Sequence, residues 1–523
     1  MNHAPATSAR YASAGSRVAG WAAIALVLLG VSVCLRAASF VDAPLDRDEG
    51  AYALVAQQWQ RGAAPYRDVF DHKPPLIYLA YRVSFAIAGE HLAGVRVLFA
   101  FANACTALAG AVIVWQLTAR RSLLPPLLAG VAACVFLNSP LVQGESANTE
   151  TLMVLGTSVA AWLIVHALPN GRTSSALLAG ICAGLAALAK PVALCEAVFF
   201  AAWLATHAAR RRALLTAFCI GLVLPSLAWG LYALAQGTLT ASVDAVLFYN
   251  LRYAGGATVP LWARIAALPI EYGAPLALLW AGVAGCTLTV LRSEPLPANF
   301  ALGWTVAALV GTLASGRIYT HYYQQLIPPM AVALGITAAA IGRLTLPRGA
   351  RLAYAVAIAV GVWPPLAAAW SFAAESANRV CTDWQPRLAG VIRALTAADD
   401  RLFIWGAEPY LTFAAERRPL SRFIYKYPLL SDTAAAGAAR RELFAAWDEQ
   451  PPAVIVVVKR EATAEPGRSV ATEIIGTEAP FHRLLTGFAP VLETSDFILY
   501  TRADVAPQPW AAQWEQTKRA RCS

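Results

Sequence analysis

Charged residues are scarce in this chain: only 14% of its 523 residues are Asp, Glu, Lys or Arg. An ordinary soluble domain carries about 25%, so the composition argues against a soluble enzyme of several domains. The sequence also lacks a Cys-x-x-Cys pair, which removes the usual grounds for a zinc site. Its nine cysteines are scattered, and seven lie in apolar stretches, where cysteine behaves as a small hydrophobic residue.

The few charges are unevenly distributed. Residues 1–371 contain 23 Lys and Arg and 13 Asp and Glu, whereas residues 372–523 contain 18 of each kind. The first part therefore has the composition of a membrane domain, and the second that of a water-soluble domain. The net charge of +10 lies wholly in the membrane part. We attribute it to membrane topology, not to nucleic-acid binding, because Lys and Arg accumulate in cytoplasmic loops.

Long apolar runs predict a polytopic α-helical membrane protein with about eleven transmembrane helices. The expected spans are 17–38, 93–117, 122–138, 150–168, 175–189, 191–208, 213–235, 265–290, 298–315, 326–342 and 352–371.

The positive charges of the connections indicate the orientation. One alternate set carries twelve: Arg10, Arg17, Arg120, Arg121, Arg172, Arg210, Arg211, Arg212, Arg292, Arg343, Arg348 and Arg351. The short connections of the other set carry four: Lys190, Arg252, Arg264 and Arg317. The positive-inside rule makes the first set and the N-terminus cytoplasmic. The large first outer loop, 39–92, and the tail, 372–523, would then be periplasmic, in a bacterial inner membrane.

The sharpest feature of the sequence is an acid-rich run in that first outer loop. Residues 42–73 hold six acids: Asp42, Asp46, Asp48, Glu49, Asp68 and Asp71. Residues 49–60 have helical periodicity, which suits a short helix lying at the membrane interface. Asp46 and Glu49 also have the spacing of a helix capping box, so some of these acids have a structural alternative. A divalent metal is possible here, since hard cations prefer carboxylate oxygens.

Lysine gives a second signal. The first 371 residues contain only Lys73 and Lys190, and each directly precedes a proline at the predicted outer face. Proline pushes the preceding residue out of the α region, so each side chain stands at a helix break. An ammonium group there is placed to hold the phosphate of a lipid, although a lysine at a helix end can also simply extend to the water.

Two other outer connections carry polar groups. Residues 143–150 place Glu145 and Glu150 at the entry of a span, where Glu150 has a helix-capping alternative. Residues 316–323 include Arg317, His321 and Tyr322. Arg317 and His321 are candidates for anion contacts, whereas aromatic residues are common in the interfacial belt of any membrane protein.

Several segments together resemble a known superfamily. They are DEGAYALVAQQWQRGAAPYRDVFDHKPPLIYLAY (48–81), GLAALAKP (184–191), RIYTHYYQQLIPP (317–329) and RLFIWGAEPYLTFAAERRPLSRF (401–423). The chain resembles GT-C superfamily glycosyltransferases, most closely those like glycosyltransferase family 39. That group is related to protein O-mannosyltransferases and to the aminoarabinose transferase of lipid A.

The resemblance implies a GT-C-like transferase that uses a polyprenyl-phosphate sugar. It matches Asp48, and next Glu49, to the acid proposed as general base, and Lys73 to a lysine that contacts the lipid phosphate. Lys190, Arg317 and His321 would be further phosphate contacts. Asp71, Glu145, Glu150 and Tyr322 are candidate contacts of the sugar or the acceptor. The aminoarabinose transferases have an arginine two places after the acidic pair, but this chain has Gly50-Ala51, which leaves the sugar and the acceptor open.

The expected reaction moves the sugar from its polyprenyl phosphate to an extracytoplasmic acceptor, which is a glycolipid, glycan or protein. Direct displacement would invert the anomeric centre, since the sequence offers no evident second, nucleophilic carboxylate. One alternative is a secondary transporter, which would place ionisable groups near the middle of the membrane. Another is a non-catalytic membrane scaffold whose tail binds a partner, which would leave the acid-rich loop and the two Lys-Pro sites unexplained. Here Glu196 is the main acid within a span.

The tail is expected to be a small α/β domain. Strands are predicted at 402–405, 453–458 and 497–501 from their apolar, β-branched and aromatic content, and a helix at 434–449. No glycine-rich phosphate loop is present in the tail, so no nucleotide site is predicted there. Cys381 and Cys522 flank the tail and could pair if it is extracytoplasmic, although spacing alone does not fix the geometry of a disulfide.

Overall fold

The computed structural model describes residues 14–118, 122–255, 259–292, 295–314, 316–344, 347–430, 434–459, 483–503 and 514. Its first part is helical: α1 (Ala14–Arg36), η1 (Ala37–Ser39), α2 (Arg47–Gln60), α3 (Leu76–Ala88), α4 (Leu92–Leu117), α5 (Leu124–Leu137), η2 (Pro140–Val142), α6 (Thr149–Asn170), α7 (Thr173–Ala189), η3 (Pro191–Ala193), α8 (Leu194–His207) and α9 (Arg211–Ala235).

The following helices are α10 (Leu239–Val243), the π-helical turn η4 (Asp244–Tyr249), α11 (Asn250–Gly255), α12 (Leu261–Tyr272), α13 (Ala277–Arg292), α14 (Pro295–Ala314), η5 (Thr320–Leu326), α15 (Ile327–Ile341) and α16 (Arg348–Thr382). The C-terminal part contains α17 (Trp384–Leu395), β1 (Arg401–Trp405), α18 (Tyr410–Ala414), β2 (Arg418–Pro419), η6 (Tyr427–Leu429), α19 (Ala434–Glu449), β3 (Val454–Val458), η7 (Arg483–Leu485), β4 (Phe488–Glu493) and β5 (Phe497–Arg502).

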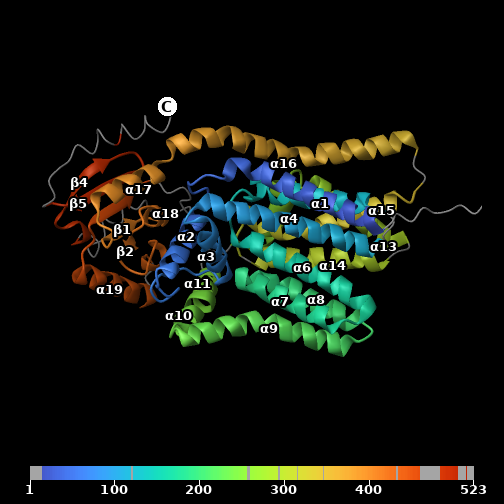
Figure 1. Cartoon of the computed structure of the whole chain (residues 1–523), viewed down its shortest axis with the longest axis horizontal. Coiled ribbons are helices and arrows are strands. Elements are labelled where there is room, and N and C mark those ends of the chain that lie inside the picture. Colours follow the sequence, from blue (N-terminus) through green and yellow to red (C-terminus); the bar gives the residue numbers. More distant parts are fainter. Residues whose placement is uncertain are drawn as a thin grey trace, which may run out of the picture.

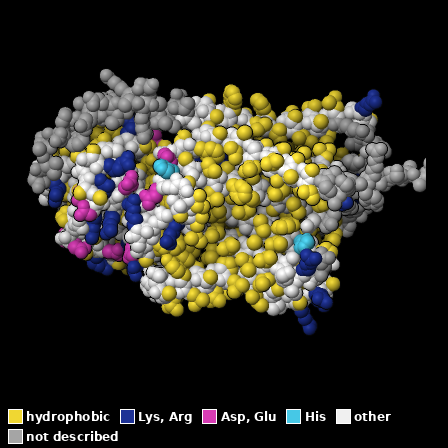
Figure 2. Space-filling view, in the orientation of Figure 1, with side chains coloured by type: hydrophobic (Ala, Val, Ile, Leu, Met, Phe, Trp, Pro, Cys, Tyr) yellow, Lys and Arg dark blue, Asp and Glu magenta, His cyan; other side chains and the backbone are white. Residues whose placement is uncertain are grey.

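The helices confirm a multi-pass membrane protein. In the part of the chain that the structure describes, seven helical segments are long and apolar enough to cross a bilayer: Arg17–Ser39, Leu92–Leu117, Thr149–Pro169, Arg211–Ala235, Leu296–Ala314, Thr320–Ile341 and Arg348–Ser376. The predicted spans 122–138, 175–189 and 191–208 correspond to shorter apolar helices, α5, α7 and the η3–α8 segment. Apolar side chains cover the helical body in Figure 2, while charged side chains gather at the end that carries the sheet.

The predicted span at 265–290 is not one continuous helix. This stretch forms two helices, α12 and α13, which meet at an angle of 110°. The break contains Gly273 and Pro275, and proline inside a helix removes a backbone donor and clashes with the preceding turn. Apolar composition alone carries no information about the direction of the chain, so the bend was not visible in hydropathy.

The tail folds around a five-stranded mixed sheet in the order β2-β1-β3-β5-β4. β1 pairs in parallel with β2 and β3, whereas β5 is antiparallel to both β3 and β4. The three strands and the helix predicted for the tail are present, as β1, β3, β5 and α19. β2 and β4 were not predicted; β2 has only two residues, and β4 is interrupted by an irregularity between Pro490 and Leu492.

The acid-rich loop lies between the helix bundle and the sheet. Figure 1 shows α2 and α3 at the end of the bundle, beside α18 and the strands. One apolar cluster joins this loop to the tail: it includes Tyr52 and Leu54 of α2, Tyr78 of α3, and Tyr410 and Tyr425 of the tail. The first outer loop and the tail therefore share a core.

Two predictions about the tail stay open. The predicted boundary between the membrane domain and the tail, at residues 371 and 372, falls inside α16, which continues as one helix to Thr382. The division into these two domains remains a prediction. The pairing of Cys381 with Cys522 involves a residue outside the described ranges.

Candidate active site

The N-terminus of α2 presents the central acid. Asp46 is the N-cap residue: its side chain accepts a hydrogen bond from the Asp48 backbone N–H, and the Glu49 carboxylate accepts one from the Asp46 backbone N–H. This is the capping box that the spacing predicted. It satisfies backbone donors that a helix start leaves without partners, and so fixes the first turn, which carries Asp48.

Asp48 faces Lys73 across the loop. The Lys73 Nζ atom lies 3.1 Å from Asp48 Oδ2, and the Tyr52 hydroxyl donates to the same oxygen at 3.2 Å. The Asp48 side chain is 29% exposed and that of Lys73 is 24% exposed. Both ionisable groups are therefore held in place and remain open to solvent.

The charges around this pair keep both groups ionised. Burial raises the pKa of Asp48, but Lys73, Arg47 and His321 lower it by more, so it lies well below its usual value. Burial lowers the pKa of Lys73, but Asp48 and its other neighbours raise it by more, so it lies above its usual value. Asp48 is thus a carboxylate and Lys73 an ammonium group at neutral pH.

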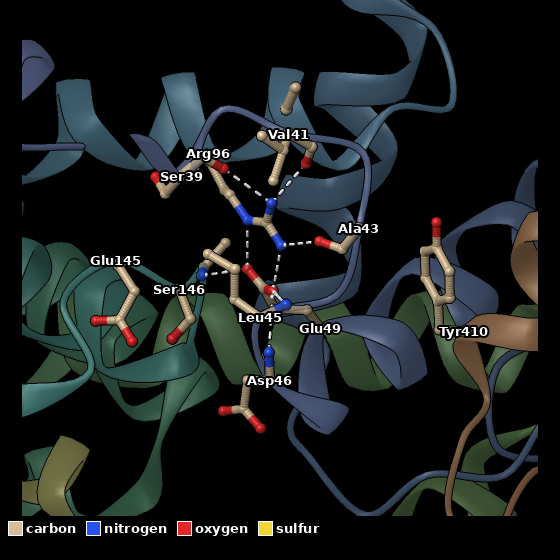
Figure 3. A network of polar contacts seen from close by, with 12 residues as sticks. Ser39, Val41, Ala43, Leu45, Asp46, Glu49, Arg96, Glu145, Ser146 and Tyr410 are labelled. Carbon is tan, nitrogen blue, oxygen red and sulfur yellow. Dashed lines mark hydrogen bonds and ion pairs between the residues drawn. The ribbon is translucent and has the colours of Figure 1, made fainter. Parts of the chain in front are cut away.

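Glu49 lies in a buried network of its own, centred on Arg96 (Figure 3). Its two carboxylate oxygens accept from Arg96 Nε at 3.0 Å and Arg96 Nη2 at 2.6 Å, and also from the backbone N–H groups of Ala147 and Leu45. The Glu49 and Arg96 side chains are fully buried. Burial raises the pKa of Glu49, but Arg96 and these N–H groups lower it by more. This geometry favours a structural role for Glu49 over the catalytic role predicted from the sequence.

Asp71 is also enclosed by partners. Its Oδ2 accepts from the Tyr78 hydroxyl at 2.8 Å, and its Oδ1 accepts from the Tyr425 hydroxyl at 2.8 Å and the His72 backbone N–H at 2.7 Å. The residue is 3% exposed. Asp71 therefore holds the segment that leads to Lys73, and this placement favours positioning over the predicted contact with sugar or acceptor.

A second group of polar side chains comes from three other elements. Lys190 forms an ion pair with Glu150 and lies over the Tyr322 ring, 3.4 Å from its centroid. His321 Nε2 lies 3.7 Å from Glu150 Oε1, and His321 Nδ1 lies 2.5 Å from Gln143 Oε1. Lys190 has extended backbone angles, φ −153° and ψ 121°, which confirms the effect expected of the following proline.

The two groups are electrostatic neighbours. Glu150 and Tyr322 contribute to raising the pKa of Lys73, after burial, which lowers it, and Asp48. The structure therefore brings together Asp48, Lys73, Lys190, Glu150 and His321 from four connections that are far apart in the sequence. Their shared region is mixed in charge, with two ammonium groups and two carboxylates.

Two predicted residues lie at the edge of this region. Arg317 is partly exposed in the connection that leads to η5. Glu145 lies in the η2–α6 connection, where its backbone carbonyl accepts from Arg36 Nη2 at 2.9 Å. Burial raises the pKa of its carboxyl to about 7.

The acid-rich run does not converge on a metal position in the part of the chain that the structure describes. No three His, Cys, Asp or Glu side chains come together there in an arrangement that could hold a metal ion. The carboxylates of the loop instead face separate partners: Asp48 faces Lys73, Glu49 faces Arg96, and Asp68 faces Arg67.

Sequence reasoning missed several partners of the site. Arg96 carried a usable signal, because an arginine within an apolar span is costly to bury and needs a partner. Tyr425 and Tyr427, which contact the loop from the tail, carried none, because nothing local connects them to a segment more than 350 residues away.

Comparison with known proteins confirms the GT-C resemblance at the level of the fold. Residues 72–229 match the family described as dolichyl-phosphate-mannose-protein mannosyltransferase. A comparison with curated proteins finds no match. The ArnT structure from Cupriavidus metallidurans bound to undecaprenyl phosphate superposes with a TM-score of 0.62 and 15% identity, covering 95% of this chain and 100% of that one.

Two further solved structures share the architecture. The Archaeoglobus fulgidus oligosaccharyltransferase AglB, in complex with an inhibitory peptide and a dolichol-phosphate, has a TM-score of 0.53 and 13% identity, covering 93% of this chain and 75% of that one. The mycobacterial arabinofuranosyltransferase AftD has a TM-score of 0.50 and 14% identity, covering 92% of this chain and 41% of that one. At these identities the likeness establishes a shared fold.

Proposed function

We propose that this chain is an integral-membrane glycosyltransferase that moves a sugar from a polyprenyl phosphate to an acceptor outside the cytoplasm. The observation that carries the proposal is the Asp48–Lys73 pair, with its oxygen and nitrogen 3.1 Å apart and both partly open to solvent. The family match, and a solved structure of the same fold bound to undecaprenyl phosphate, support a lipid-phosphate donor.

In the proposed reaction, Asp48 is the general base. It accepts the proton of an acceptor hydroxyl as the oxygen of that hydroxyl forms a bond to the anomeric carbon. The bond from the anomeric carbon to the phosphate oxygen breaks at the same time, and polyprenyl phosphate leaves. The charges around Asp48 hold its pKa well below its usual value, so it is ionised and can accept a proton. A low pKa also makes it a weaker base, so the proton must transfer as the new bond forms. A direct displacement of this kind inverts the anomeric centre.

Lys73 is the proposed contact for the departing phosphate. A positive group aimed at the place where negative charge develops stabilises the transition state more than the ground state. Lys190, His321 and Arg317 are proposed to add positive charge or hydrogen bonds for the lipid phosphate. Glu150 holds Lys190 in position through their ion pair.

The proposed orientation follows from the charge of the connections. The N-terminus lies in the cytoplasm of a bacterium, and the first outer loop and the sheet-bearing tail lie in the periplasm. The site then lies at the outer face of the inner membrane, where the acceptor is a glycan, a lipid or a protein.

The experiment compares cell-envelope glycolipids and glycoproteins by mass spectrometry in strains with and without this chain. The proposal expects one sugar-bearing species to disappear, while its unused lipid-phosphate donor accumulates. The same transfer is then measured in detergent-permeabilised membranes, where no sealed compartment remains. If the chain is a transferase, sugar transfer still requires it in the permeabilised membranes. Transfer that no longer depends on the chain after permeabilisation would indicate a transporter, and an unchanged envelope would contradict both.

A further inference from the structure

The C-terminal tail reaches into the first outer loop at the residues that neighbour the two proposed reacting groups. The Tyr425 hydroxyl donates to Asp71, which lies two residues before Lys73. Tyr427 accepts a hydrogen bond from Arg47 and lies under its guanidinium group, 5.2 Å from ring centroid to Cζ. Arg47 directly precedes Asp48. One short segment of the tail thus contacts a near neighbour of Lys73 and the residue directly before Asp48.

This segment is tied to the loop by its backbone as well. The Phe70 N–H donates to the Arg422 carbonyl at 2.8 Å, and Phe70 forms a parallel bridge with Phe423. The Arg422 guanidinium also donates to the Tyr66 carbonyl at 3.2 Å. The loop and the tail are therefore in fixed register immediately beside the two tyrosines.

The other side of the segment is held by the sheet. The Lys426 N–H, between the two tyrosines, donates to the Gly406 carbonyl at 3.0 Å. Gly406 directly follows β1, which pairs with β2 on one side and with β3 on the other. The positions of Tyr425 and Tyr427 are thus set by the sheet, and through them the tail can set the distance between Asp48 and Lys73.

We infer that the tail is a positioning part of the active site: Tyr425, through Asp71, and Tyr427, through Arg47, hold Lys73 and Asp48 in register for sugar transfer. This inference rests on the proposed function, because it assigns Asp48 and Lys73 their roles in the reaction. It gives the sheet-bearing tail a task in catalysis that is distinct from recognition of the acceptor.

The contact at Tyr427 also bears on the pKa of Asp48, because it holds Arg47 beside that carboxylate. Burial raises the pKa of Asp48, and Arg47 is, after Lys73, the strongest influence that lowers it. If Arg47 moves away from Asp48 when this contact is lost, the pKa of Asp48 rises. The base would then become protonated at a higher pH, so the acid limb of the transfer rate would move to higher pH.

The experiment uses the full chain in membranes of a strain that lacks it, since these membranes carry the natural donor and acceptor. Tyr425→Phe and Tyr427→Phe are compared with Tyr500→Phe, a control on β5 that pairs within the sheet. The initial rate of transfer is measured from pH 3 to 8, together with the amount of folded protein. We expect each site variant to be about tenfold slower or more, since small displacements of reacting groups are costly. Binding of undecaprenyl phosphate should stay within twofold.

The pH profile separates positioning from general damage. Tyr427→Phe should move the acid limb to higher pH, and Tyr500→Phe should leave both rate and profile unchanged. Wild-type rates and profiles in both site variants would overturn the inference, as would an equal loss in Tyr500→Phe. If Tyr427→Phe does not fold, Arg47→Lys tests the same contact: it keeps the charge but loses the planar guanidinium fork.

Asp48→Asn in the same membranes tests the proposed function separately. An inactive Asp48→Asn variant beside fully active tyrosine variants would overturn only the role of the tail. An active Asp48→Asn variant would remove the proposed base itself.

Discussion

Glu49 and Asp48 are adjacent in the sequence, yet the structure predicts opposite consequences when each is neutralised. Glu49→Gln removes the negative charge that faces the Arg96 guanidinium, and both side chains are 0% exposed. Breaking a buried ion pair by removing one partner costs about 3–5 kcal/mol, because the remaining charge is left without compensation. Glutamine keeps the volume and one acceptor oxygen, so we expect a loss near the lower end, about 3 kcal/mol.

Asp48→Asn should behave differently. The Asp48–Lys73 pair is partly exposed, at 29% and 24%, and ion pairs of this kind contribute about 0–1 kcal/mol. The structure thus predicts a stable Asp48→Asn protein without transfer activity. It predicts a destabilised Glu49→Gln protein whose folded fraction keeps its activity.

The assay measures unfolding of the detergent-purified full chain by denaturant or heat, and transfer in membranes at a temperature where Glu49→Gln remains folded. Arg96→Gln is the matched control, since it removes the other half of the same buried pair. A Glu49→Gln protein of wild-type stability that fails to transfer sugar would refute the structural assignment and return Glu49 to the chemistry. An Asp48→Asn protein as unstable as Glu49→Gln would refute the separation of the two roles.

Three other outcomes follow from the same contacts. Lys73→Ala should weaken binding of undecaprenyl phosphate by at least about tenfold with the fold intact, as calorimetry would measure, whereas Lys459→Ala on the tail should leave it unchanged. Burial and the neighbouring Asp48 carboxylate raise the pKa of Asp46 to about 6, so the folded state loses stability as the pH rises through 6 and this carboxyl ionises. Asp46→Asn removes that charge and should therefore raise the melting temperature more at pH 8 than at pH 5. Lys190→Ala leaves the buried Glu150 carboxylate without the ammonium group that pairs with it, and should lower the free energy of unfolding by about 3–5 kcal/mol. Adding Glu150→Gln should restore much of this loss.

The helical framework could be predicted because a helix that crosses a bilayer needs a long apolar run, and such runs are directly visible in the sequence. The α2 start was equally visible, since a capping box is a local pattern and Asp46 and Glu49 form it. The strands β1, β3 and β5 were visible from β-branched and aromatic runs. These features depend on neighbours in the sequence, which a single chain displays directly.

The partners of the acids could not be predicted in the same way. Glu49 pairs with Arg96, 47 residues away, and Asp71 pairs with Tyr425, 354 residues away. The sequence shows six carboxylates in the run 42–73. Only the fold separates Asp48, which stays accessible beside Lys73, from Glu49 and Asp71, which are enclosed. The bend between α12 and α13 was missed for a related reason, since hydropathy measures content and not direction.

The most direct test of the Asp48–Lys73 site is complementation of a strain that lacks this chain, read by mass spectrometry of the envelope. Wild-type protein and Lys459→Ala should both restore the missing sugar-bearing species. Asp48→Asn, expressed and folded to the same level, should restore none or only a trace, because general-base catalysis typically contributes about 10²–10⁴-fold. Full restoration by Asp48→Asn would contradict the account.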